Sequence, residues 1–71
     1  MITLKMTESD YYDGDTDEYV MVIGASVTSL QTDVKIRDLD GTVWDCYLSS
    51  VEFIPGDRGK RDVYIVRYKV Y

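Results

Sequence analysis

The chain has 71 residues, with 13 Asp and Glu against 8 Lys and Arg, so its formal net charge is −5. This length allows one domain, residues 1–71, whose core buries about 60% of the unfolded surface. With no His and a single Cys, the sequence excludes internal disulfides, zinc sites built from Cys and His, and catalysis by His. It also lacks a phosphate-cradling glycine loop, so we expect a protein that is not an enzyme and uses no cofactor or metal.

Most of the chain shows the two-residue hydrophobic period of half-buried β-strands. The alternation over residues 2–7 predicts a first strand, and the apolar, β-branched run 19–23 predicts a strand buried on both faces. Residues 24–26 indicate a bulge or turn. Residues 27–32 leave open whether the second strand continues or bends into the third.

The clearest local signal is Asp40-Gly41 between apolar flanks, which predicts a β-hairpin. A two-residue loop would pair apolar residues with polar ones. A three-residue loop, residues 39–41 with Gly41 in a left-handed bulge, gives one apolar face and an opposite-charge pair on the other face, so we predict that loop. The predicted pairs are Val34 with Cys46, Lys35 with Asp45, and Ile36 with Trp44.

The remaining residues complete an all-β pattern. Leu48 extends the apolar face, Ser49-Ser50 breaks the pattern, residues 51–54 resume it, and residues 55–60 form a turn cluster. Residues 62–71 predict a final strand. No segment predicts a helix of useful length, so we predict an all-β, small barrel of five or six antiparallel strands. One face of the last strand would carry Tyr64, Val66, Tyr68 and Val70.

This layout resembles that of the SH3-like barrels. Ser9-Asp10-Tyr11-Tyr12-Asp13 is loosely similar to the Ala-Leu-Tyr-Asp-Tyr box of peptide-binding SH3 domains. Trp44 stands alone where that family has a Trp pair, and the chain has no Pro-x-x-Tyr, so the resemblance implies the fold and no binding residues. It implies a long acidic loop at 8–18, a distal hairpin at 34–48, a short 3₁₀ turn at about 49–53, and a closing strand.

The negative charge is concentrated in residues 8–18, which hold six acids and no base, whereas the rest of the chain holds 7 acids and 8 bases. Our hypothesis is that this segment is an exposed loop that contacts a partner, because acids steer a basic surface and tyrosines supply contact area. A merely solvated loop, weak cation binding and DNA mimicry remain alternatives. The proposed contact residues are Glu8, Asp10, Tyr11, Tyr12, Asp13, Asp15, Asp17 and Glu18.

Two specific versions of these alternatives conflict with the sequence. An EF-hand loop starting at Asp13 needs Gly at its sixth position and Glu at its twelfth, where this chain has Glu18 and Gly24. Strict DNA mimicry needs acids spread along a surface at duplex spacing, whereas these acids occupy one segment. We do not expect Tyr11 and Tyr12 to share an aromatic cage for a methylated cation, because neighbours on an extended backbone point to opposite sides.

Other candidates are better explained by packing. Trp44 is predicted to be the largest core residue rather than a pocket wall, and Cys46 is predicted to point inward and be inert. The basic segment 58–69 has residues suited to nucleic acid, but the net charge of −5 argues against that role. We therefore predict that Tyr64 and Tyr68 lie in the core and that Arg67 and Lys69 are solvated.

Small acidic chains without a targeting signal are similar to accessory proteins of phages and mobile elements, which often bind and inhibit a host protein. That resemblance implies a complete, cytoplasmic protein whose partner is a host protein with a basic surface. No apolar run approaches the ~20 residues of a membrane span, so we expect no membrane contact. The alternatives are a structural homo-oligomer, in which turn 58–61 of one copy meets the acidic segment of another, and nucleic-acid binding.

Overall fold

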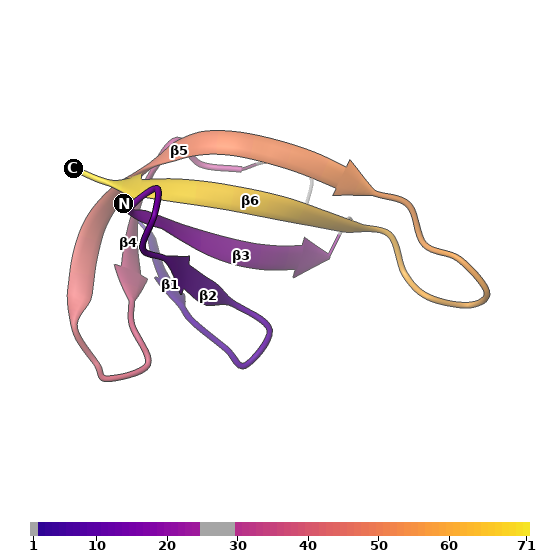
Figure 1. Cartoon of the computed structure of the whole chain (residues 1–71), viewed down its shortest axis with the longest axis horizontal. Coiled ribbons are helices and arrows are strands. Elements are labelled where there is room, and N and C mark those ends of the chain that lie inside the picture. The colour runs from indigo at the N-terminus through magenta and orange to yellow at the C-terminus, as the bar shows by residue number, and fades with distance from the viewer. Residues whose placement is uncertain (1, 25–29) are drawn as a thin grey trace.

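The structure, a computed structural model, describes residues 2–24 and 30–71. Within these residues the chain forms one six-stranded sheet that curls into a half-barrel, and no helix (Figure 1). The predicted all-β fold is thus confirmed, and the layout is compatible with an SH3-like barrel. No described segment forms a helix long and apolar enough to cross a membrane. The strands are β1 (Ile2–Lys5), β2 (Tyr11–Asp13), β3 (Glu18–Gly24), β4 (Asp33–Arg37), β5 (Val43–Ile54) and β6 (Val63–Val70).

The sheet order is β1-β4-β5-β6-β3-β2, and its one parallel pair is β1 with β4. Ile2 lies opposite Val34 and Leu4 opposite Ile36, while the other four strand pairs are antiparallel. The prediction of an entirely antiparallel sheet is therefore wrong at this edge. A hydrophobic period fixes which face of a strand is buried, but it carries no information about strand direction.

The β4–β5 hairpin has the predicted register. Val34 pairs with Cys46 and Ile36 with Trp44. The loop closes through the Asp38 amide, which donates to the Thr42 carbonyl at 2.7 Å, and Gly41 has a φ of +93°. On the opposite face Lys35 Nζ lies 3.4 Å from Asp45 Oδ1, as the three-residue loop requires.

β5 does not end at the serines. It runs unbroken through Ser49 and Ser50, and the register against β6 shifts between Leu48 and Ser50. This β-bulge inserts one extra residue, so Leu48 lies opposite Tyr68 and Val51 opposite Val66, two residues on the same face of β6, although Leu48 and Val51 are three apart in sequence. The predicted break of the pattern at Ser49-Ser50 is therefore the bulge, whereas the predicted 3₁₀ turn at about 49–53 is wrong. Much of the predicted turn at 24–26 and the open segment 27–32 lies outside the described residues.

The core lies on one face of the curled sheet, called here the inner face. The last strand contributes as predicted, because Val66 and Tyr68 are buried while Tyr64 and Val70 pack against the core. Trp44 shares this face with Ile36, yet 41% of it is exposed, so its prediction as a core residue is wrong. The buried cluster consists of Met6, Tyr19, Met21, Val34, Ile36, Cys46, Val66 and Tyr68.

The acidic segment is not an irregular loop. Its centre forms β2, which pairs with β3 so that Tyr11 lies opposite Val20 and Tyr12 opposite Tyr19. The intervening turn contains Asp17 with a φ of 57°. The sequence pattern does not reveal β2, because the three residues Tyr-Tyr-Asp are too few to show a hydrophobic period. Their strand geometry comes from pairing with β3.

Candidate functional site

Asp10 is a structural residue, only 8% exposed. One carboxylate oxygen accepts hydrogen bonds from the backbone N–H of Thr7 at 2.8 Å and from the Thr7 hydroxyl at 3.1 Å. The other accepts from the backbone N–H of Val22 at 2.9 Å. Asp10 thus ties the chain before β2 to the outer edge of β3, which leaves its carboxylate unavailable to a partner.

Asp13 and Glu18 pair with a base, Arg67, that the sequence predicts to be solvated. Arg67 on β6 lies 3.2 Å from the Asp13 carboxylate and 3.5 Å from that of Glu18, which is itself only 7% exposed. The predicted solvation of Arg67 is therefore wrong. The pairing follows from sheet order, because β3 is hydrogen-bonded to both β2 and β6 and brings the acids beside the arginine.

Both carboxylates are held in their ionised form. The hydrogen bond from Arg67, followed by that from the Asp15 backbone N–H, lowers the pKa of Asp13. A hydrogen bond from the Ser49 hydroxyl is the largest influence lowering the pKa of Glu18, with Thr16 and Arg67 adding to it against the opposing effect of burial. The bulge residue Ser49 therefore also serves this ion-pair cluster.

The other residues of the predicted contact surface are exposed. Glu8, Asp15 and Asp17 are at the surface, and Tyr11 and Tyr12 are 52% and 46% exposed. The structure thus divides the eight predicted residues. Three carboxylates act within the fold, and five side chains remain open to solvent.

The exposed part of this hairpin borders a pocket of about 370 Å³ at one end of the half-barrel. Tyr12 and Tyr19 come from the β2–β3 hairpin, where their ring centroids lie 4.9 Å apart with planes inclined at 51°. Trp44 comes from β5, and Val70 from the end of β6. The strand pairs place all four on the inner face, so the pocket is the part of the barrel interior that the core leaves unfilled.

Two aspartates complete this pocket, here called the mouth pocket. The Tyr12 hydroxyl donates to Asp17, and the Tyr19 hydroxyl donates to Asp38 at 3.0 Å. The bond to Asp17 raises the pKa of Tyr12, and burial together with the bond to Asp38 raises the pKa of Tyr19 well above its ordinary value. Both phenols therefore stay neutral and act as donors, with their rings held beside two carboxylates.

Tyr12 and Asp17 belong to the predicted contact surface, but the sequence does not reveal the other members of the pocket. Its patterns indicate only a turn at Asp38, a buried strand at Tyr19 and a core position at Trp44. One signal was present in the sequence, because the hairpin loop carries Asp38 and Asp40 as a second acidic turn. Nothing in the sequence shows that the two acidic turns lie at the same end of the sheet.

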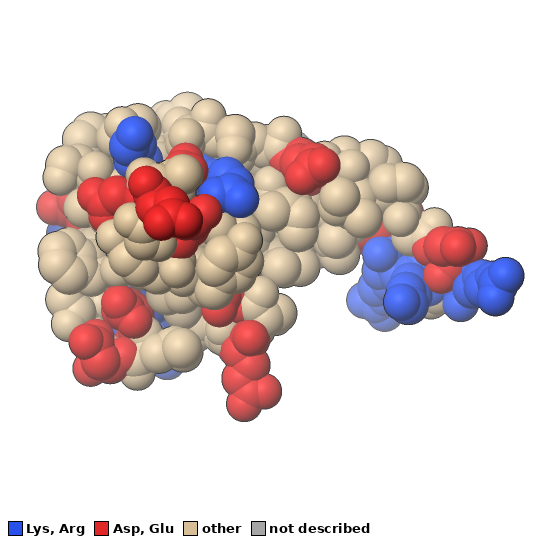
Figure 2. Space-filling view, viewed as in Figure 1, with Lys and Arg blue, Asp and Glu red and all other residues tan. Residues whose placement is uncertain are grey.

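The charges are separated along the molecule (Figure 2). Acidic side chains, with a few basic ones among them, gather on the body and at the ends of both hairpins, whereas basic side chains, with acidic ones beside them, gather on the loop between β5 and β6 at the opposite end of the long axis. That loop carries Arg58, Lys60 and Arg61, all exposed. The mouth pocket therefore lies at the negative end of the molecule.

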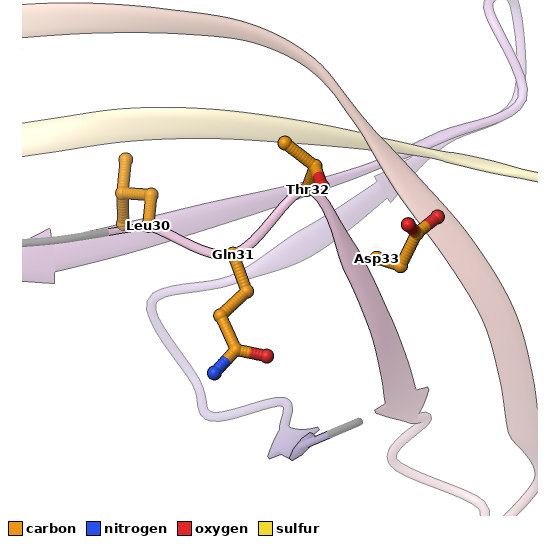
Figure 3. A pocket seen from close by; sticks show the side chains of 4 residues that line it. All are labelled: Leu30, Gln31, Thr32 and Asp33. Carbon is orange, nitrogen blue, oxygen red and sulfur yellow. The ribbon is translucent and has the colours of Figure 1, made fainter.

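A second hollow, of about 480 Å³, lies along residues 30–33 (Figure 3). It is open, and Gln31 points away from Leu30 and Thr32. Its one carboxylate, Asp33, already accepts a hydrogen bond from the Tyr71 hydroxyl. Although larger, this hollow gathers no set of convergent groups, so the mouth pocket is the better candidate site.

Metal binding and thiol chemistry have little support in the described residues. No group of three or more Cys, Asp or Glu there is placed to hold a metal ion. Cys46 is buried, as predicted, and burial raises the pKa of its thiol to about 11, which keeps it in the unreactive protonated form.

No protein-family model, curated protein or solved structure matches this chain. Fold and site therefore define the protein only by class. It is a small all-β half-barrel with an aromatic pocket at its mouth and acidic turns around that pocket.

Proposed function

We propose that this chain is a small accessory protein that binds a host protein with a basic surface, and inhibits it, through the exposed part of the acidic hairpin. The observation that supports this most directly is that the exposed rings of Tyr12 and Trp44 lie with Asp17 and Asp38 around one pocket. Such a surface attracts a basic partner from a distance and gives it aromatic contact area on arrival. We place the binding in the cytoplasm.

The contact surface that we propose leaves out three of the eight predicted acidic-segment residues. Because Asp10, Asp13 and Glu18 bind groups within the chain, the contacts belong to the five exposed side chains, of which Tyr12 and Asp17 line the mouth pocket. The carboxylates of the β4–β5 turn join them. Asp40 adds a charge there, since hydrogen bonds from the Thr42 backbone and side chain lower its pKa. The contact set is Glu8, Tyr11, Tyr12, Asp15, Asp17, Asp38 and Asp40.

The test is to capture a partner from host-cell lysate, identify it by mass spectrometry, and measure its association rate with purified variants. Asp15→Asn with Asp17→Asn removes two exposed charges, and Asn tolerates the left-handed backbone at position 17. We expect association to slow about tenfold at low salt, with the difference shrinking above about 0.15 M salt as charges are screened.

A matched control removes the same charge elsewhere. Glu52→Gln with Asp57→Asn also removes two exposed acids, but from β5 and from the basic loop. We expect this variant to associate at close to the wild-type rate. If both double variants slow association equally, the effect belongs to net charge and the proposed surface is wrong.

A second candidate function is a homo-oligomer. Two observations favour it. One is the arrangement of charge in Figure 2, and the other is the side of β5 away from β6 at residues 50–54, with which no described residue pairs. Sheet edges of this kind join subunits. Analytical ultracentrifugation separates the candidates, because a closed oligomer of the purified chain favours this one and a monomer favours the first.

Nucleic-acid binding has less support. Tyr68 is buried and Arg67 is paired with two carboxylates, so two of its four candidate residues are already engaged within the fold. That leaves Lys69 and the half-buried Tyr64 on β6. A mobility shift with single-stranded oligonucleotide, lost as salt rises, is the result that would revive this function.

A further inference from the structure

We infer that the mouth pocket binds an organic cation, the alkylammonium or guanidinium end of a side chain that the partner inserts into the half-barrel. This inference rests on the proposed function and names the chemistry of its central contact. It concerns Tyr12, Tyr19, Trp44 and the two aspartates beside them.

The lining supplies the surfaces that a cation prefers. Three aromatic side chains come from two hairpins, and the fourth wall is the aliphatic Val70. A cation within about 6 Å of an aromatic ring face is attracted by the electron density there, most strongly by tryptophan. Trp44 is half-exposed on the inner face, so its ring is accessible to a ligand that enters the mouth.

The charge around the pocket selects the sign of the ligand. Asp17 and Asp38 both line it, and its described lining contains no Lys or Arg. Two basic side chains of the same sheet already have acidic partners, with Lys35 beside Asp45 and Arg67 beside Asp13. An anion entering here would meet two unopposed carboxylates, whereas a cation would be stabilised by them.

Both tyrosine hydroxyls are already hydrogen-bonded within the pocket. Each donates a hydrogen bond to one of the two aspartates, Tyr12 to Asp17 and Tyr19 to Asp38. These bonds fix the ring positions before a ligand binds, which reduces the side-chain entropy lost on binding. Mouths of small barrels are also a common place for ligand sites.

The test uses choline and its neutral isostere 3,3-dimethyl-1-butanol, with Trp44 as the reporter because it is the one tryptophan of the chain. We expect choline to change the fluorescence and the indole N–H resonance of Trp44 saturably. The isostere should bind about tenfold more weakly, since it has the same shape without the charge. Equal affinity for both molecules would overturn the inference.

Two variants and one control locate the binding. Tyr12→Leu removes a pocket ring, and Asp17→Asn removes a charge while tolerating the backbone at position 17. We expect each to weaken choline binding about fivefold to tenfold. Tyr11→Leu is the matched control, because Tyr11 is adjacent and equally exposed but lies on the other face of β2. If neither pocket variant weakens binding, or the control weakens it as much, the pocket is not the site.

Methylguanidinium and methylammonium, titrated in the same way, distinguish an arginine-like from a lysine-like ligand.

The outcome of the choline titration can be told apart from the outcome of the partner-association experiment that tests the proposed function. Partner association that depends on Asp15 and Asp17 without any choline binding leaves the acidic surface in place and rejects the pocket ligand. Choline binding without any charge-dependent partner supports the pocket ligand and rejects the acidic contact surface.

Discussion

The six acids of residues 8–18 have three different roles, set by where each carboxylate lies. Asp10 is buried and accepts backbone N–H groups, so it acts as a fixed structural link. Asp13 and Glu18 share Arg67 at the sheet surface. The remaining three lie in solvent, where Asp17 also accepts the Tyr12 hydroxyl. A cluster that looks uniform in sequence is therefore partly scaffold and partly surface.

The Arg67 cluster predicts a specific loss of stability in acid. Because the folded chain holds the pKa values of Asp13 and Glu18 below their ordinary 3.8 and 4.5, the unfolded chain takes up protons first as pH falls. Their contribution is complete above about pH 5 and is lost as pH falls through the lowered values. Urea denaturation between pH 2 and 7 should show this decline.

Arg67→Gln should make the decline shallower, because it removes the largest influence on the pKa of Asp13. Arg37→Gln is the control, since it removes the same charge from an exposed position on β4. It should keep the wild-type dependence on pH. Identical pH profiles for wild type and Arg67→Gln would show that the cluster does not couple folding to protonation.

At the scale of the elements, local geometry sets the two hairpins and the bend of β5. The bulge between Leu48 and Ser50 lets one twelve-residue strand pair with β4 at its start and with β6 along its end. Bulges also increase strand twist, which fits the curl of β5 in Figure 1. The turn at Gly41 aligns β4 with β5 and so brings Trp44 and Asp38 to the mouth pocket.

Gly41→Ala tests that turn. A Cβ there would meet no atom within 4 Å, so the whole effect is backbone strain at a φ of +93°. We expect a loss of about 1–2 kcal/mol in the free energy of unfolding, measured by urea denaturation. Gly14→Ala is the control, because its Cβ would lie 3.8 Å from the Tyr12 ring, an ordinary contact, and its φ is not positive. An unchanged unfolding midpoint for Gly41→Ala would contradict the proposed strain.

At the scale of the whole molecule, the curled sheet brings together strands that are not neighbours within it. β3 and β4 are separated by β6 and β5 in the sheet order, yet the Tyr19 hydroxyl on β3 reaches Asp38 at the end of β4. This bond spans the open side of the half-barrel. It also forms one wall of the mouth pocket, so the stability of the fold and the shape of the site depend on the same contact.

Tyr19→Phe should therefore reduce the free energy of unfolding by about 1 kcal/mol, the usual value of one hydrogen bond to a part-buried acceptor. Thermal unfolding followed by circular dichroism measures it. Tyr12→Phe removes a hydroxyl whose bond to Asp17 lies within one exposed hairpin, so it should leave the unfolding midpoint unchanged. Equal effects of the two variants would argue against a special role for the bond across the barrel.

The sequence alone determined those features that depend on neighbouring residues. The period of two identified most strands and the face of β6 that packs in the core, and Asp40-Gly41 identified the hairpin and its register. These features follow from local sterics and burial of one face, which a short segment encodes by itself. The segment rich in acids and tyrosines was also evident, though not the separate roles of its members.

Only the tertiary structure decided which distant residues meet. The parallel pairing of β1, the pairing of Arg67 with two acids, and the exposure of Trp44 all depend on sheet order and curl, which no local pattern carries. The mouth pocket is the clearest case, because Tyr19, Asp38, Trp44 and Val70 come from four different strands or turns. Its chemistry exists only because the sheet bends back on itself and leaves one end of the interior unfilled.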